Sequence, residues 1–182
     1  MEPIIKEKVR ILRPDEYGQL RASLNPLRQL LVDGLLTTGM RYTEAQALQG
    51  HIEWLEGQFI KTQSKKSETK FKNRWIRLSD YGRLCVPNFI KGSRLPGRQA
   101  LDESLKRWAI KAGLDPVVIC CKTFRKTWES WLVFYYPQHH LEIASRQGHT
   151  STTQLAYYLD MPFSMTDRIK MKMWVDGWIG TS

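Results

Sequence analysis

The stretch from Lys122 to Asp160 constrains this chain more than any other. It begins with two cations, Lys122 and Arg125, which lie on one face of a turn if the segment is helical. A Gln-Gly-His sequence ends at His149, and Tyr158 follows nine residues later. A phenol with an ordinary pKa of about 10 is a poor nucleophile unless cations surround it and its target. Cations gathered around a tyrosine in a basic chain therefore indicate an anionic electrophile such as a phosphodiester.

The net charge supports a polyanionic partner. Lysine and arginine total 28 against 18 acidic residues, which gives a net charge of +10 and a pI of about 9.7. Such a balance favours nucleic acid. Seven cations and one acid lie between Lys61 and Arg77, interleaved with Phe71 and Trp75. We interpret this run as a hairpin that reaches toward a phosphate backbone, with a solvated loop as the alternative. The expected DNA-binding side chains are Lys61, Lys66, Lys70, Lys72 and Arg74.

Length and cysteine content set the class of protein. A chain of 182 residues is long enough for one sizeable core, and we expect a single domain over 1–182. Its three cysteines, two of them adjacent at 120–121, favour a reduced, cytoplasmic protein. No apolar run approaches the roughly 18 residues of a membrane span, and the N-terminus lacks a secretory apolar region. We therefore expect no membrane partner.

The pattern of apolar residues and helix signals predicts an α+β, mainly helical fold with a small antiparallel sheet or hairpin at one edge. Residues 1–12 are expected to be a frayed or extended lead-in, and 80–100 a connector. Asn25 and Pro26 predict a helix start, and Gly39 its end. Its apolar face would run from Leu27 to Leu36, and Thr43 can cap the next helix. The remaining elements are expected to be a helix from Pro14, strands around Trp54, at Gln58–Gln63 and Arg74–Leu78, and helices at Leu101–Ala112, Thr123–Tyr136, His140–Gln147, Thr152–Leu159 and Met165–Trp178.

Other chemistries have weaker support. Potential metal ligands occur at 120, 121, 139, 140 and 149, but there is no CxxC or HxxxH pair, and adjacent ligands rarely converge on one ion. No nucleophile-elbow or phosphate-loop motif is present. We therefore expect no metal and no cofactor. The remaining candidate catalytic residues are Arg41, Lys65, Lys122, Arg125, His149 and Tyr158.

Four blocks together resemble the catalytic domain of a tyrosine recombinase, or phage-type integrase. They are TTGMRYTEAQAL, TQSKKSETK, KTFRKTW and RQGHTSTTQLAYY, in this order, within residues 11–160. The family carries an arginine followed by an acid, a hairpin lysine, an HxxR block, a Gly-His block and a tyrosine nucleophile. The matching positions are Arg41 with Glu44, Lys65, Lys122 with Arg125, Gly148 with His149, and Tyr158.

Three departures from the family pattern are visible. Lys122 replaces the usual first histidine of HxxR, which resembles integrases of archaeal spindle-shaped viruses and suggests viral genome integration. A lysine can still donate hydrogen bonds to phosphate. Tyr157 is an alternative nucleophile beside Tyr158. The N-terminal DNA-clamping domain of the family is not recognisable, so we expect an isolated or minimal catalytic domain.

The resemblance implies a DNA recombinase that cleaves and rejoins strands through a 3′-phosphotyrosyl bond without metal or ATP. Arg41 and Arg125 would clamp the phosphate, and Glu44 would orient Arg41 or a neighbouring cation. Lys65 would protonate the leaving 5′-oxygen, and His149 would bind the phosphate or help to deprotonate the phenol.

Alternatives remain at the level of sequence. They are a type IB topoisomerase-like activity, a catalytically impaired DNA-binding relic, and a generic basic RNA-binding protein. The expected partner is double-stranded DNA. The free protein is expected to be monomeric or weakly associated and to assemble on DNA into a synaptic tetramer. The apolar tail helix Met165–Trp178, within 161–182, would pack on its own domain or dock on a neighbouring protomer.

Overall fold

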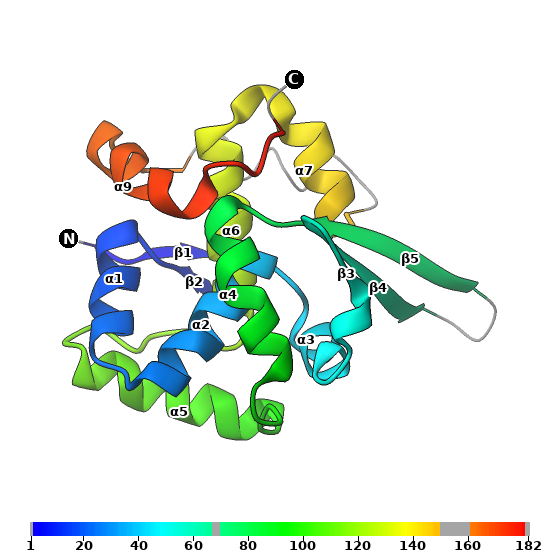
Figure 1. The fold of residues 1–182 in the computed structure, drawn as a ribbon. Coiled ribbons are helices and arrows are strands. Elements are labelled where there is room, and N and C mark those ends of the chain that lie inside the picture. The colour runs from blue at the N-terminus through cyan, green and yellow to red at the C-terminus, as the bar shows by residue number, and fades with distance from the viewer. Residues whose placement is uncertain (1, 67–69, 150–160, 181–182) are drawn as a thin grey trace.

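Helices make up most of the protein in the computed structural model, which describes residues 2–66, 70–149 and 161–180. Two strands come first, and a group of three strands lies between the third and fourth helices (Figure 1). In chain order the elements are β1 (Ile4–Lys6), β2 (Val9–Ile11), α1 (Pro14–Ala22), α2 (Pro26–Thr38), α3 (Tyr42–Leu48), the 3-10 helix η1 (Ile52–Trp54), β3 (Leu55–Glu56), β4 (Phe59–Lys66), β5 (Lys70–Arg77), α4 (Asp80–Lys91), α5 (Arg98–Lys111), α6 (Lys122–Tyr135), the 3-10 helix η2 (Pro137–His139), α7 (His140–Gln147) and α9 (Met165–Val175). The expected α+β, mainly helical class is confirmed.

Helix α6 lies at the centre of the protein and contacts β2, α2, α7 and α9 (Figure 1). Its residues from Thr127 to Val133 are all buried, and Trp128 and Trp131 are fully buried. Tyr17 of α1 packs edge-on against Trp131, with ring centroids 5.9 Å apart. Burial of such large rings stabilises the fold strongly, so the start of α6 is held on a rigid base.

Helix α2 follows the expected signals at both ends. The Asn25 side chain accepts a hydrogen bond from the Arg28 backbone N–H, and Gly39 ends the helix in the left-handed region at φ 56°. The apolar face was placed wrongly at its start, because Leu27 is 73% exposed, whereas Leu35 and Leu36 are buried. At the first turn of α2 the chain still lies at the surface.

Helix α4 replaces most of the connector predicted for 80–100, so that prediction was wrong. The Ser79 side chain caps the helix by accepting from the Gly82 N–H. Val86, Phe89 and Ile90 are buried against a core that α4 shares with α2. Pro87 lies inside the helix, where it costs a backbone hydrogen bond. The burial of the apolar face outweighs that cost.

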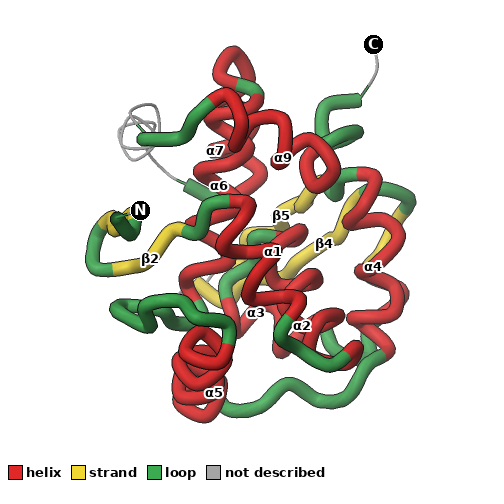
Figure 2. Tube along the Cα trace, turned by 90° about the vertical axis from the view of Figure 1, so that its left-hand side faces the viewer, coloured by secondary structure: helices red, strands yellow, loops and turns green. Residues whose placement is uncertain are grey.

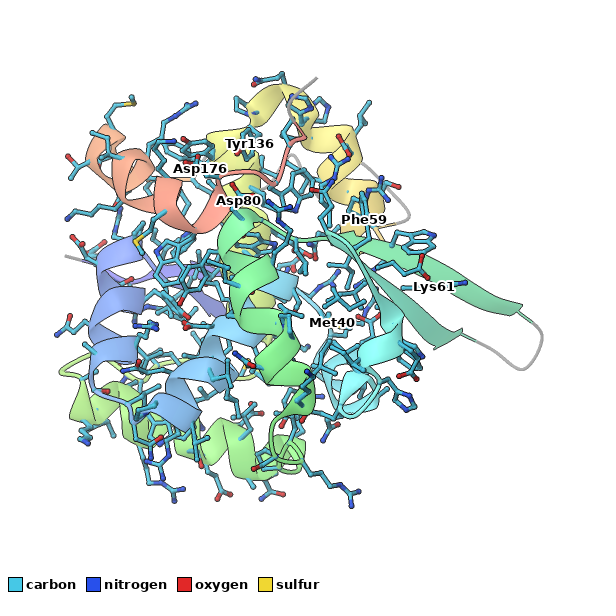
Figure 3. All side chains as sticks on the ribbon, in the orientation of Figure 1. Met40, Phe59, Lys61, Asp80, Tyr136 and Asp176 are labelled. Atoms are coloured by element: carbon cyan, nitrogen blue, oxygen red, sulfur yellow. The ribbon has the colours of Figure 1, made fainter. Side chains whose placement is uncertain are left out.

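The three-stranded antiparallel sheet has the order β3-β4-β5, and β4 and β5 form a long hairpin that projects from the helical body (Figure 1). The strand predicted around Trp54 is instead the 3-10 helix η1, and the strand begins at Leu55. Thr62 pairs with Arg74, and both are buried. Lys61 pairs with Trp75 on the opposite face, where Figure 3 shows the Lys61 side chain on the projecting hairpin. Side chains alternate between faces along a strand.

The N-terminal lead-in is extended, which is one of the two alternatives that the sequence left open. Strands β1 and β2 pair antiparallel, and Ile11 and Leu12 are fully buried. The Leu12 backbone N–H donates to the Thr127 hydroxyl of α6 at 3.0 Å. Ile4, Val9, Ile11 and Leu12 of this segment therefore belong to the core.

Helix α9 packs on this protein's own core through one face. Trp174 and Trp178 are buried, whereas Met165, Ile169 and Met173 are exposed. The sequence left open whether this segment docks on its own domain or on a neighbour. In the structure Trp174 and Trp178 of this segment pack in the core of its own domain. Figure 2 shows α5 at the opposite end of the molecule from α7 and α9.

None of the helices within the described ranges is long and apolar enough to cross a membrane. The three cysteines are present as free thiols.

Candidate active site

Three arginines and one histidine from separate parts of the chain meet beside the C-terminal end of α7. Arg41 precedes α3, Arg74 lies on β5, and Arg125 lies in the first turn of α6. His149 lies two residues after the end of α7, beyond Gly148. We call these four residues, with Glu44 and Glu129, the arginine cluster. The first turn of α6, the junction before α3 and the Gly-His block therefore come together in the structure.

Backbone carbonyl groups at the end of α7 hold the guanidinium groups together. The Gln147 carbonyl accepts from Arg74 Nη1 at 3.0 Å and from Arg125 Nη2 at 2.5 Å. The Gly148 carbonyl lies 3.5 Å from Arg41 Nη2. Carbonyl groups at a helix C-terminus have no partner within the helix and carry partial negative charge. The end of α7 is thus a natural site for cations.

Gly148 is required here for conformation and for space. Its φ is 72°, in the left-handed region that favours glycine. A Cβ atom at this position would lie 2.7 Å from Arg74 Nη1. A larger residue would push Arg74 away from the Gln147 carbonyl. This steric limit explains why the Gly-His block has glycine at position 148.

Glu44 joins two of the arginines. Its Oε2 accepts from the Arg41 backbone N–H at 2.8 Å and from Arg74 Nη2 at 3.0 Å. Its Oε1 accepts from Arg41 Nη1 at 3.2 Å. Arg41 is therefore the N-cap residue of α3, in place of the expected Thr43, and Glu44 fixes both its backbone and its side chain.

Glu129 joins Arg125 and His149, and sequence reasoning missed it. It lies on α6 one turn after Arg125 and is 1% exposed. Its Oε1 lies 3.0 Å from both Arg125 Nη2 and His149 Nε2. The four-residue spacing from Arg125 on a predicted helix was the available signal.

The charges of the arginine cluster do not balance. Three guanidinium groups and an imidazole face two carboxylates. Burial lowers the pKa of Arg74 to about 10; Glu44 opposes this shift, while Arg125 and Arg41 add to it. The side chain of Arg41 is 41% exposed, and those of Arg125 and His149 are each 12% exposed. The cluster is suited to hold an anion that reaches it from solvent.

The other predicted catalytic residues are Lys122, Lys65 and the two tyrosines, and the structure describes only some of them. Lys122 begins α6 one turn before Arg125 and is exposed. Lys65 lies near the end of β4, where its backbone pairs with Phe71, and Lys66 pairs with Lys70. Tyr157 and Tyr158 lie outside the described residues, as does the predicted helix Thr152–Leu159.

Arg74 differs from the other residues expected to bind DNA. Its side chain is 8% exposed and donates to Glu44 and to the Gln147 carbonyl. Its contact with DNA stays a prediction, and the geometry gives it a clear supporting role within the cluster. Among the described residues, no group of three or more His, Cys, Asp and Glu side chains gathers as a metal site would require.

No family model matches the sequence, and no curated protein matches it. Solved structures do match the fold. The XerA recombinase has a TM-score of 0.66 at 16% identity over 94% of this chain and 65% of its own. A lambda integrase (75–356) dimer bound to a COC′ core site has a TM-score of 0.65 at 14% identity, covering 86% of this chain and 61% of its own. The catalytic domain of bacteriophage HP1 integrase has a TM-score of 0.58 at 20% identity, covering 89% and 94%.

These matches define the architecture. The chain spans less than two thirds of the XerA and lambda integrase chains, but nearly the whole of the isolated HP1 catalytic domain. The protein therefore has the fold of the catalytic domains of tyrosine recombinases.

Proposed function

We propose that this protein is a site-specific DNA recombinase of the integrase type, which cleaves and rejoins DNA through a 3′-phosphotyrosyl intermediate. The observation that carries the proposal is the surplus of positive charge in the arginine cluster. A phosphodiester brings the negative charge that such a cluster lacks, and its transition state brings more. The fold and the basic hairpin support the same substrate.

The proposed chemistry begins at Tyr158. Its phenol oxygen attacks phosphorus, a new O–P bond forms, and the bond from phosphorus to the 5′-oxygen breaks. Lys65 gives a proton to the departing 5′-oxygen, which leaves as a hydroxyl. The reverse reaction, by a 5′-hydroxyl from another strand, restores the phosphodiester and releases the tyrosine. The covalent intermediate retains the bond energy, so the step needs no nucleotide cofactor.

The two arginines make unequal contributions in this proposal. Arg125 contacts three protein oxygens, those of Gly39, Gln147 and Glu129. A guanidinium has five N–H donors, so Arg125 has at most two for a phosphate. Arg41 is more exposed and is held mainly by Glu44. We therefore assign the larger share of the phosphate contacts to Arg41 and a fixed, oriented contact to Arg125.

His149 and Lys122 complete the proposed site. His149 hydrogen-bonds the phosphate or receives the proton of the phenol. Lys122, exposed at the start of α6, supplies a hydrogen-bond donor where the family carries a histidine. Glu44 keeps Arg41 and Arg74 in place.

The proposal extends to partners and biology. The partner is double-stranded DNA, contacted by the hairpin side chains at 61, 66, 70 and 72. The free protein is monomeric, and several copies assemble on DNA into a synaptic tetramer. Integration of a viral genome, as in the archaeal viruses with a lysine at the position of Lys122, is the biological role we favour.

Covalent trapping on DNA tests the proposal. A nicked substrate that loses its 5′-hydroxyl strand after cleavage would accumulate a protein–DNA adduct, detectable on a denaturing gel. We expect Tyr158→Phe to abolish the adduct while DNA affinity stays nearly unchanged, because only the nucleophile is lost. Tyr157→Phe is the matched control and should retain the adduct.

Other outcomes point to other functions. An adduct that survives Tyr158→Phe but not Tyr157→Phe would move the nucleophile by one residue. DNA binding with no adduct from the unaltered protein would favour a binding relic. Relaxation of supercoiled DNA that carries no recombination site would favour a type IB topoisomerase-like activity.

A further inference from the structure

Glu129 is a buried carboxylate at the centre of the arginine cluster that the proposed chemistry does not use. It lies on the central helix α6, and its Oε1 contacts both Arg125 and His149 at 3.0 Å. An ionised carboxylate with 1% exposure is costly unless cations and hydrogen bonds offset the lost solvation. Its two neighbours in the cluster, Arg125 and His149, are residues to which we assign roles at the phosphate.

We propose that Glu129 is a positioning residue that fixes the ring of His149 and the guanidinium of Arg125 toward the DNA phosphate. The inference rests on the proposed function and adds a residue to it. Glu129 does not touch the reacting atoms in this proposal. It acts through the two groups that do.

The contact with His149 determines which ring nitrogen carries a proton. An ionised carboxylate only accepts hydrogen bonds, so the proton between Glu129 Oε1 and His149 lies on Nε2. The partner of one ring nitrogen sets the state of the other. The contact with Glu129 thereby fixes both the orientation of the ring and the nitrogen that carries the proton.

The contact with Arg125 has a similar effect on the guanidinium. Nη2 faces both Glu129 and the Gln147 carbonyl, while Nη1 donates to the Gly39 carbonyl. The three acceptors come from three separate segments, so together they restrict rotation of the planar group. A side chain held this way loses less conformational entropy when it meets a phosphate.

The protonation of His149 can be measured without any enzymatic activity. Nitrogen-15 NMR of histidine-labelled protein distinguishes protonated from unprotonated ring nitrogens, and loss of one signal set in His149→Gln assigns the residue. We expect a proton on Nε2 in the unaltered protein. An unprotonated Nε2 would overturn the proposal.

Glu129→Gln tests the effect on chemistry. It keeps the size of the side chain and removes its charge, so we expect covalent cleavage of nicked DNA to slow by roughly 10–100-fold. The dissociation constant for DNA should change less than about threefold, because the hairpin contacts remain. Cleavage within about twofold of the unaltered protein would overturn the proposal.

Glu16→Gln is the matched control. Glu16 forms a similar ion pair with buried Arg10 at 2.6 Å, but its partners belong to β2 and α1 and not to the arginine cluster. It should lower stability while leaving cleavage by the folded protein unchanged. If both variants slow cleavage equally, Glu129 has only a structural role.

A third variant covers the case in which Glu129→Gln does not fold. Glu129→Asp keeps the charge and draws the oxygens back by one methylene, so it should fold and show intermediate cleavage. Equal cleavage by Glu129→Asp and the unaltered protein would contradict positioning. If the unaltered protein forms no adduct at all, the proposed function has failed, and the NMR result still decides whether Glu129 holds the His149 proton.

Discussion

Two groups of charged side chains in this protein differ in charge balance. In the first, which we call the Asp33 cluster, Asp33 accepts from the Tyr17 hydroxyl at 2.5 Å, the Tyr81 hydroxyl at 2.8 Å and Arg21 Nε at 2.9 Å. One acid meets one cation, and two neutral phenols complete the hydrogen bonds. Trp174 of α9 covers the phenols, with ring centroids 5.1 and 4.6 Å away. This cluster is closed and neutral.

The arginine cluster is open and positively charged. Its cations outnumber its carboxylates, and the pKa of Arg74 falls because burial and the neighbouring arginines disfavour its charge. In the Asp33 cluster the pKa of Arg21 rises, chiefly through its hydrogen bond to Asp33. A balanced cluster stabilises the fold, whereas a surplus of one sign costs stability and creates affinity for the missing ion. This difference in charge balance is the reason that we propose the arginine cluster, and not the Asp33 cluster, as the functional site.

Removing Asp33 should give the largest loss of stability. Asp33→Ala leaves Arg21, the buried Tyr17 phenol and the partly buried Tyr81 phenol without their acceptor, and removing the buried partner of an ion pair costs up to about 3–5 kcal/mol. Urea unfolding at neutral pH would measure the loss. The remaining folded protein should still cleave DNA at the normal rate. A loss below about 1 kcal/mol would show that the cluster is not a stabilising one.

Arg41→Ala should slow DNA cleavage strongly and leave the stability of the fold almost unchanged. Loss of one donor to the transition-state charge is expected to slow cleavage by about 10²–10³-fold. The unfolding free energy should change by less than about 0.5 kcal/mol, because the side chain is 41% exposed and its removal relieves Arg74. Arg83→Ala is a matched control, since Arg83 is 49% exposed and pairs with Asp80 at the same three-residue spacing. It should alter neither quantity. A large destabilisation by Arg41→Ala would make the two clusters alike.

The sequence predicted the parts of the site that depend on local signals. Asn25, Pro26 and Gly39 set the ends of α2, and the bounds His140–Gln147 of α7 were predicted correctly. These signals act within a few residues, through capping and left-handed backbone conformations. They placed Arg41 and His149 at element ends, and in the structure Arg41 reaches the Gly148 carbonyl beside His149.

The features that the sequence did not predict depend on packing between distant segments of the chain. Pro87 predicted a connector, but burial of Phe89 against Gly34 of α2 makes α4 a helix. The lysine-rich sequence around Arg74 did not indicate that this side chain is buried. The Gln147 carbonyl to which it donates comes from a distant part of the chain. The burial of Glu129 likewise depends on how α6 lies against its neighbours.

Inorganic phosphate should stabilise the protein through the arginine cluster alone. An anion that binds the folded state raises its stability by mass action, and we expect about 1 kcal/mol, or roughly 2–4 °C in melting temperature. Sodium chloride at matched ionic strength should have a smaller effect. Arg41→Ala should reduce the shift caused by phosphate, whereas Tyr81→Phe should keep it. An equal shift in both variants would mean that phosphate acts elsewhere on the surface.

The smallest expected effect concerns alkaline pH and the Asp33 cluster. Burial, followed by the hydrogen bond to Asp33, raises the pKa of Tyr81 to about 12, while an unfolded tyrosine ionises near 10. Because the folded-state pKa is raised, the contribution of this phenol to the free energy of unfolding is complete below pH 10 and declines as the pH rises from 10 toward 12.

Tyr81→Phe keeps the ring against Trp174 but loses one hydrogen bond, so it should lower the free energy of unfolding by about 1 kcal/mol at pH 7. Because phenylalanine has no proton to lose, the gap between variant and unaltered protein should narrow above pH 10. Urea unfolding at several pH values would measure it. A gap that stays constant to pH 11 would show that the phenol does not depend on Asp33 in the way the geometry indicates.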